Sequence, residues 1–270
     1  DCSPMVRQVR AVKSSYEIDM IRQAAALADR MAGFAATVLR EGIPEIEMAG
    51  LLEAEARRLG HQGLVRMRLW DGEMFYGHFM SGWSAAVPGC LASPTGGAAM
   101  SPAFGQGPGP KKIEAGEPIL FDYVFARQGY LADHTRIYCL GELPENLMEG
   151  HKAMLELQAL VSREALPGKR VGDIYDLALG FVKSKGYANY FMGADDGRVS
   201  FIAHGIGLEL DELPFIAAGQ KMKLQEGMVI AMEPKLVFPG QGVVGIENTL
   251  LVTENGLERL TQFEDGIVAL

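Results

Sequence analysis

The sequence lacks the features of a membrane protein and of a nucleic-acid-binding protein. No apolar run approaches the ~20 residues that a membrane-spanning helix needs, and no basic and apolar signal segment opens the chain. The formal net charge is −9, and Lys and Arg do not cluster into a cationic face. Because phosphate contacts need clustered cations, we expect neither nucleic acid nor a membrane as a partner.

Cysteine is also scarce. Cys2, Cys90 and Cys139 are an odd number and lack the spacing of a metal site. Incidental thiols of this kind are typical of a reducing compartment, so we predict a cytoplasmic protein. The chain has 270 residues, of which 48% are apolar and 22% charged. That composition is typical of an ordinary globular protein with a substantial core.

The hydrophobic pattern predicts the same order of elements twice: two helices, strands and a hairpin. A capping box at Ser14 and Glu17 opens the first helix. We expect the first unit to contain helices to about residue 40 and over 46–59, strands near 64–69 and 74–80, a long loop over 82–109 and a hairpin over 118–138. We expect the second unit to contain helices from 144 to about 167 and over 172–185, strands near 199–210 and a hairpin over 228–252.

This repeat favours an α+β fold made of two similar halves around one shared site. No linker separates the halves, so we predict a single domain over residues 1–270. The first residues show no structural pattern and no initiator Met. Because a capped long helix opens so early, we interpret residues 1–12 as the remnant of a linker to a missing N-terminal domain.

Two aspartates lie symmetrically about the expected turn of the first hairpin. Asp122 and Asp133 are centred on 127–128, which predicts direct cross-strand neighbours with Cβ atoms ~5 Å apart. Two ionised carboxylates so close repel each other, so either one is protonated or a cation lies between them.

The last hairpin repeats the arrangement, with Glu233 and Glu247 centred on Gly240. Facing acids on a hairpin are often no more than its solvent face. Here the segments PILFDYVF and MVIAMEPKL are apolar and are predicted to be buried. Four buried anions need counter-charge, and hard divalent cations supply it. His204, in the glycine-rich segment FIAHGIGLEL, adds a nitrogen ligand that favours a transition metal.

Four segments resemble a known superfamily in the same order and spacing. GYLADHTRIYCLG, AHGIGLELDELP, EGMVIAMEP and GIENTLLVTENGLERLT are similar to the ligand segments of the methionine aminopeptidase, proline aminopeptidase, prolidase and creatinase superfamily, metallopeptidase family M24. The resemblance implies its pita-bread fold, with a curved antiparallel sheet and two divalent ions, Mn²⁺ first and Co²⁺, Zn²⁺ or Fe²⁺ as alternatives. A homodimer is compatible with the resemblance. The implied metal ligands are Asp122, Asp133, His204, Glu233 and Glu247, and Glu233 would also polarise or deprotonate the water that bridges the two ions.

Three positions depart from the family pattern. Gly89 and Asp211 stand where the family usually has histidines that orient the substrate and act on the reacting amide. Gly245 stands where it has an arginine. The metal ligands are intact, whereas the residues that would handle the substrate are not.

Other residues are candidates to replace the missing histidines. Strand alternation directs His78 into the cleft, where its imidazole would act catalytically, although a packed core or surface histidine is the simpler interpretation. Asp211 would bind a substrate ammonium or act as an acid, or else be a surface residue. Trp83 would line a substrate pocket, or simply pack. His61 and His151 lie in helical surroundings and are expected at the surface.

We therefore predict a dinuclear metallohydrolase of the Xaa-Pro dipeptidase or aminopeptidase type that acts on short peptides. The proline preference rests on the resemblance alone. Two alternatives stay open: a non-peptidase hydrolase or lyase of small molecules on the same metal site, and a catalytically silent metal-binding module.

Overall fold

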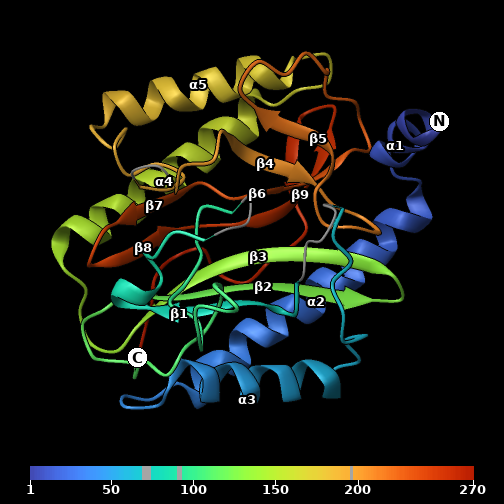
Figure 1. The fold of residues 1–270 in the computed structure, drawn as a ribbon. Coiled ribbons are helices and arrows are strands. Elements are labelled where there is room, and N and C mark those ends of the chain that lie inside the picture. The colour runs from blue at the N-terminus through green and yellow to red at the C-terminus, as the bar shows by residue number, and fades with distance from the viewer. Residues whose placement is uncertain (69–73, 90–92, 195–196) are drawn as a thin grey trace.

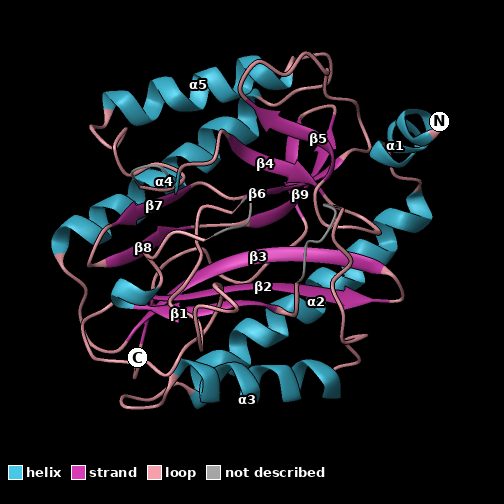
Figure 2. Ribbon diagram, in the orientation of Figure 1, coloured by secondary structure: helices cyan, strands magenta, loops and turns pink. Residues whose placement is uncertain are grey.

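The computed structural model describes residues 1–68, 74–89, 93–194 and 197–270. Cys90 and the end of the strand expected at 64–69 therefore lie outside the described residues. Strands fill the middle of the molecule, and the longer helices cover them on two opposite sides (Figures 1 and 2). Among the described residues, no helix is long and apolar enough to span a membrane.

The capped helix that the sequence predicted is present in the N-terminal half. In α2, the Ser14 side chain accepts a hydrogen bond from the Glu17 backbone N–H, and the Glu17 carboxylate accepts one from the Ser14 N–H, so both donors of the capping box are satisfied. The elements of this half are α2 (Ser15–Val38), α3 (Glu45–Arg58), β1 (Gly77–Ser81), the short 3₁₀ helix η1 (Gly82–Ser84), β2 (Ile119–Arg127) and β3 (Tyr130–Cys139).

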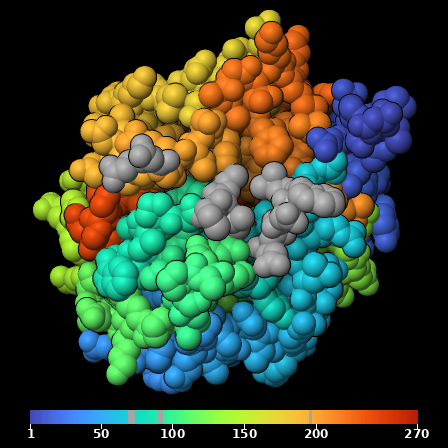
Figure 3. Space-filling view, viewed as in Figure 1, coloured from blue at the N-terminus to red at the C-terminus, as the bar shows by residue number. Residues whose placement is uncertain are grey.

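The C-terminal half repeats the order of two helices followed by strands. Its elements are α4 (Glu145–Glu164), α5 (Val171–Ser184), β4 (Phe201–Gly205), β5 (Glu212–Ala217), β6 (Val229–Met232), β7 (Lys235–Phe238), β8 (Gly242–Gly245), β9 (Asn248–Thr253), β10 (Gly256–Arg259) and β11 (Val268–Ala269). The α+β class is confirmed, and the two halves meet across the middle of the face drawn in Figure 3.

The described strands form three sheets. One has the order β1–β2–β3–β11, the second β10–β9–β6–β4–β5, and β7 pairs with β8 alone. All pairs are antiparallel except β11 with β3. An isolated bridge between Thr135 on β3 and Glu247, just before β9, links the two halves. One apolar core lies between each helix pair and its sheet. Two smaller apolar clusters join the halves, one around Val124 and Val229 and one around Ile137 and Val243, and the polar side chains of the pocket lie beside them.

Two local expectations were wrong. The first residues are not without structure, because α1 (Ser3–Ala11) is a helix with Pro4 in its first turn. Ion pairs fix this helix to the start of β5 and the segment before it: Arg10 pairs with Glu209 and with Glu212, the first residue of β5. In addition, the stretch near 64–69 forms no described strand, and its one ladder contact is the bridge between Met67 and Leu210.

Candidate metal centre

The first hairpin brings Asp122 and Asp133 to one face of β2 and β3, but in a different register from the predicted one. Asp122 pairs with Thr135, and Asp133 pairs with Val124. The two aspartates are therefore diagonal neighbours, and the predicted direct pairing was wrong. The turn lies at Gln128–Gly129, with φ of 50° and 87°. Positive φ at both central residues matches the strand twist, so this turn fixes the register.

The second hairpin has the predicted centre. β7 and β8 pair from Lys235 with Gly245 to Phe238 with Gly242, which places the turn around Gly240. Beyond the strands, the Ile246 N–H still donates to the Pro234 carbonyl at 3.2 Å. Glu233 and Glu247 lie one step further out, at the open end of this hairpin, where it meets β3.

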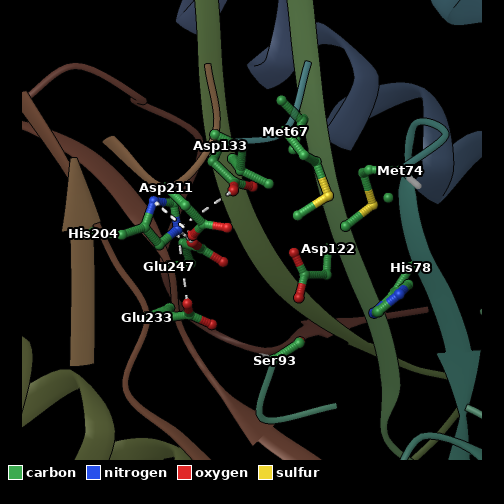
Figure 4. A pocket seen from close by; sticks show the side chains of 13 residues that line it. Met67, Met74, His78, Ser93, Asp122, Asp133, His204, Asp211, Glu233 and Glu247 are labelled. Atoms are coloured by element: carbon green, nitrogen blue, oxygen red, sulfur yellow. Dashed lines mark ion pairs between the residues drawn. The ribbon is translucent and has the colours of Figure 1, made fainter. Parts of the chain in front are cut away.

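The five expected ligands line one pocket. His204, on β4, points its Nε2 into it, 4.0 Å from Asp133 Oδ2, 3.8 Å from Glu233 Oε1 and 3.9 Å from Glu247 Oε1. Figure 4 shows these side chains converging from the two halves. The pocket is lined by Met67, Met74, Gly77, His78, Ser93, Asp122, Val124, Asp133, His204, Leu210, Asp211, Glu233 and Glu247.

One corner of this pocket fits a metal ion. Ligand atoms of Asp133, His204 and Glu247 all lie within 4.8 Å of one another, and all three residues are buried. Asp133 Oδ1 is buried and has no hydrogen-bond partner in the described part of the chain, although buried polar atoms are nearly always paired. Two carboxylates and an imidazole suit a first-row transition ion. A cation here would satisfy the orphaned oxygen.

Lys235, which was not predicted from the sequence, contacts three of the four carboxylates of the site. Its Nζ lies 3.0 Å from Asp122 Oδ2, 2.7 Å from Glu233 Oε2 and 2.8 Å from Glu247 Oε2. The side chain is 1% exposed. Burial alone would lower the pKa of Lys235, but its three carboxylate partners raise that pKa well above the usual value. A lysine two residues after a ligand, inside an apolar strand, was the signal that would have revealed it.

Burial also alters the acids of the site. It raises the pKa of Asp133 well above its usual value, and the neighbouring carboxylate of Glu247 adds to the effect. Burial raises the pKa of Glu233 to about 7, although the Lys235 ammonium opposes the shift. His204 behaves differently: burial would lower its pKa, but the surrounding carboxylates, first that of Asp211, raise it. The pocket therefore attracts positive charge.

Of the residues proposed to replace the missing histidines, two line the pocket. His78 pairs with Asp122 across β1 and β2, and its Nδ1 lies 3.3 Å from Thr95 Oγ1. Asp211 Oδ1 lies 3.8 Å from His204 Nδ1, on a residue with a φ of 63°. Trp83 is 50% exposed and is not among the described residues that line the pocket. Its role in substrate binding stays a prediction.

Two of the three departures have a structural explanation. A Cβ on Gly89 would lie 2.8 Å from the Gly96 Cα, so the loop closes on itself at that point. Gly245 has a φ of 152°, and a Cβ there would lie 2.4 Å from the Pro234 carbonyl oxygen. Neither backbone position accepts the larger side chain of the family pattern without rearrangement.

Buried hydrogen bonds hold the ligands in place. The Thr135 hydroxyl donates to Glu247 Oε2 at 2.9 Å, and the Thr249 hydroxyl donates to the Asp133 carbonyl at 2.8 Å. The Arg136 guanidinium, fully buried, donates to the Glu247 carbonyl at 2.8 Å. The first contact fixes the Glu247 side chain, and the other two fix the backbone that carries Asp133 and Glu247.

Comparison with known proteins agrees with this geometry. The model of metallopeptidase family M24 matches residues 19–254. The chain is 30% identical over 260 residues to an Xaa-Pro dipeptidase of Pyrococcus furiosus, covering 96% of this chain and 66% of that one. An X-Pro aminopeptidase from Thermotoga maritima superposes with a TM-score of 0.83 at 28% identity over 99% of this chain and 66% of its own.

A second solved structure, a prolidase from Pyrococcus horikoshii, superposes with a TM-score of 0.80 at 29% identity, over 97% of this chain and 66% of its own. The fold is therefore the pita-bread fold that the sequence predicted. The chain spans 66% of the length of these curated relatives, and the match runs through all four ligand segments.

Proposed function

Since the chain belongs to metallopeptidase family M24, we propose that it is a metal-dependent peptidase of the Xaa-Pro dipeptidase or aminopeptidase type that acts on short peptides. The observation that carries this proposal is the convergence of four carboxylates, three of them buried, and His204 on one pocket. The names of the relatives support the substrate class. A location in the cytoplasm and a homodimer belong to the same proposal.

The chemistry that a bound divalent ion supplies is acidification of a water molecule and polarisation of the scissile carbonyl. The side chains of the pocket do the remaining work. Glu233 Oε1 lies 3.8 Å from His204 Nε2, at the edge of the corner that would hold the ion, where its carboxylate is placed to accept a proton from the water and return it to the leaving amine. His204 and Asp133 hold the ion, and Thr135 orients Glu247 as a further ligand.

His78 and Asp211 are proposed to replace the two missing histidines. His78 is buried beside Asp122 and directs its ring into the pocket (Figure 4). Burial lowers its pKa, so the neutral imidazole orients the substrate by hydrogen bonding instead of by charge. Asp211 is a negative group at the pocket wall, which suits the ammonium of a free N-terminus. Met67 and Met74 give the opposite wall an apolar surface.

The metal remains part of the proposal. Mn²⁺ is the first choice, with Co²⁺, Zn²⁺ and Fe²⁺ as alternatives, because an imidazole with carboxylates accepts all of them. The expected second ion stays a prediction, and the contacts of Lys235 oppose it.

A non-peptidase reaction on the same centre is a second candidate function. It is favoured by Gly89, whose close approach to Gly96 leaves no room for the histidine of the family pattern. A panel of Xaa-Pro and non-proline dipeptides together with small amides, each with added Mn²⁺, separates the two candidates. Peptide turnover supports the first, and turnover of non-peptides alone supports the second. Metal binding without turnover would identify a silent module.

The role of Glu233 provides the direct test. Glu233→Gln keeps the size of the side chain but removes the base, so we expect kcat to fall by at least about 100-fold. Glu226→Gln is the matched control. Glu226 is exposed and lies just before β6, whereas Glu233 directly follows β6, and the kcat of this variant should be unchanged. Full turnover by Glu233→Gln would refute the proposed mechanism.

A further inference from the structure

We propose that the Lys235 ammonium occupies one of the two cation positions of this site, so that the protein binds a single divalent ion. The inference rests on the proposed function only in assuming that the pocket binds metal. It changes the expected stoichiometry and the way Asp122 is held. The remaining ion lies at the corner formed by Asp133, His204 and Glu247.

The position of the ammonium excludes an ion beside it. Lys235 Nζ contacts carboxylates from both hairpins, at 3.0 Å from Asp122 and 2.8 Å from Glu247. A divalent ion bound to the same oxygens would lie about 2.0–2.6 Å from them. It would therefore overlap the ammonium, and either the lysine or the ion fills the space. Asp122 thus has a lysine as its counter-charge.

The Lys235 side chain cannot move away from its carboxylate partners without a large energetic cost. Its side chain is 1% exposed, so leaving the carboxylates would mean burying an unpaired ammonium or opening the strand pair. Gly245, opposite it on β8, provides the space for its stem: a Cβ on Gly245 would lie 3.1 Å from Lys235 Cγ. The loss of a side chain at Gly245 and the presence of a lysine at position 235 therefore fit together.

The other corner remains free for metal. Asp133 Oδ1 has no hydrogen-bond partner within the described ranges, and His204 Nε2 faces Asp133, Glu233 and Glu247 at 3.8–4.0 Å. Lys235 lies 12 residues from Glu247 along the chain and uses the other oxygen of that carboxylate, Oε2. Glu247 Oε1 thus remains available to an ion beside His204.

The charges are consistent with one ion. Four carboxylates face one ammonium and one divalent ion, which leaves a single negative charge to attract a protonated substrate. If the carboxylate of Asp211 is included, five negative charges would balance one ammonium and two divalent ions, so the charge balance by itself also allows a second ion. The steric overlap at Nζ therefore decides the number.

Metal content measured on the full chain tests the inference. After equilibration with Mn²⁺ and removal of free ion, elemental analysis should give one equivalent per chain, with the paramagnetic resonance spectrum of an isolated Mn²⁺. Lys235→Ala should take up two equivalents and show spin coupling between them. Lys235→Met keeps most of the volume and should not exceed one. Lys221→Ala, at an exposed lysine, should match the wild type.

Two equivalents in the wild type would overturn the inference and leave the proposed function intact. One equivalent in folded Lys235→Ala would also overturn it, and circular dichroism identifies a variant that has not folded. If Lys235→Ala does not fold, the wild-type value still decides. No metal in any variant would overturn the inference along with the metal centre. A protein with one equivalent that turns over no peptide would leave the inference standing and refute the proposed function.

Discussion

His61 shows how a single buried residue sets a pH dependence. Its surface position was predicted wrongly, as was that of His151, and both are buried. His61 Nε2 donates to the Val124 carbonyl at 3.1 Å, and Nδ1 accepts from the Gly63 N–H at 2.8 Å. A second ring proton would meet that N–H, and burial lowers the pKa of His61 to about 4. Helical periodicity could not reveal this, because the ring packs on Tyr76 of another segment.

We expect His61 to lower the free energy of unfolding at acid pH. Its pKa is about 4 in the folded state and near 6.5 in the unfolded chain, so the unfolded state binds the proton first. The stability is complete above pH 6.5 and is lost as the pH falls toward 4. At about pH 5 the loss is about 2 kcal/mol. Urea unfolding of the wild type and of His61→Asn at pH 7 and pH 5 measures this loss. If the free energy of unfolding falls equally in both proteins between the two pH values, His61 is not its cause.

The candidate ligands and Lys235 show which single residues could be predicted from the sequence and which could not. The five candidate ligands were identified from carboxylate spacing and from the resemblance. Lys235 was missed, although its place two residues after Glu233 in an apolar strand points to it. Only its contact with Asp122 depends on how the two hairpins meet, and neither hairpin encodes that contact by itself.

At the scale of elements, local signals predicted the helices well. The capping box at Ser14 and the breaks at Gly42 and Pro44 bound α2 within about two residues. The register of β2 with β3 was less predictable, because moving a turn by one residue changes every cross-strand pair. The predicted turn was centred on residues 127–128, whereas the observed turn is Gln128–Gly129, because Gly129 adopts the positive φ of 87° that this turn needs.

Glu45, at the start of α3, organises the long loop after β1. Its Oε1 accepts from the Ser81 N–H and hydroxyl at 2.8 and 3.1 Å. Its Oε2 accepts from the Ser84 hydroxyl and the Gly109 N–H, both at 3.1 Å. One buried carboxylate thus joins the two ends of the loop that carries Thr95, the partner of His78.

We expect Glu45→Gln to destabilise the protein by about 2 kcal/mol, because its amide would turn donors toward donors. It should also raise KM, since the loop forms part of the pocket wall, while metal content stays unchanged. Glu47→Gln is the control on the same helix. Its ion pair with Arg40 is about half exposed, so the loss should stay below about 1 kcal/mol. Equal thermal unfolding of the two variants would contradict the role of Glu45.

At the scale of the whole molecule, the site exists only where the two halves meet. Asp122 and Asp133 come from the N-terminal half, and His204, Glu233 and Glu247 come from the C-terminal half. The bridge between Thr135 and Glu247 joins them. The repeated order of elements predicted this shared site, but not the contacts across it, because those depend on packing between residues more than 100 positions apart.

The most direct test is anomalous diffraction from crystals of the protein grown with Mn²⁺. We predict one anomalous peak, bound by Asp133, His204 and Glu247 at about 2.0–2.6 Å, with Lys235 Nζ still against Asp122. A map with no peak in this pocket, and with those carboxylates turned toward solvent, would contradict the metal centre on which the proposed function depends.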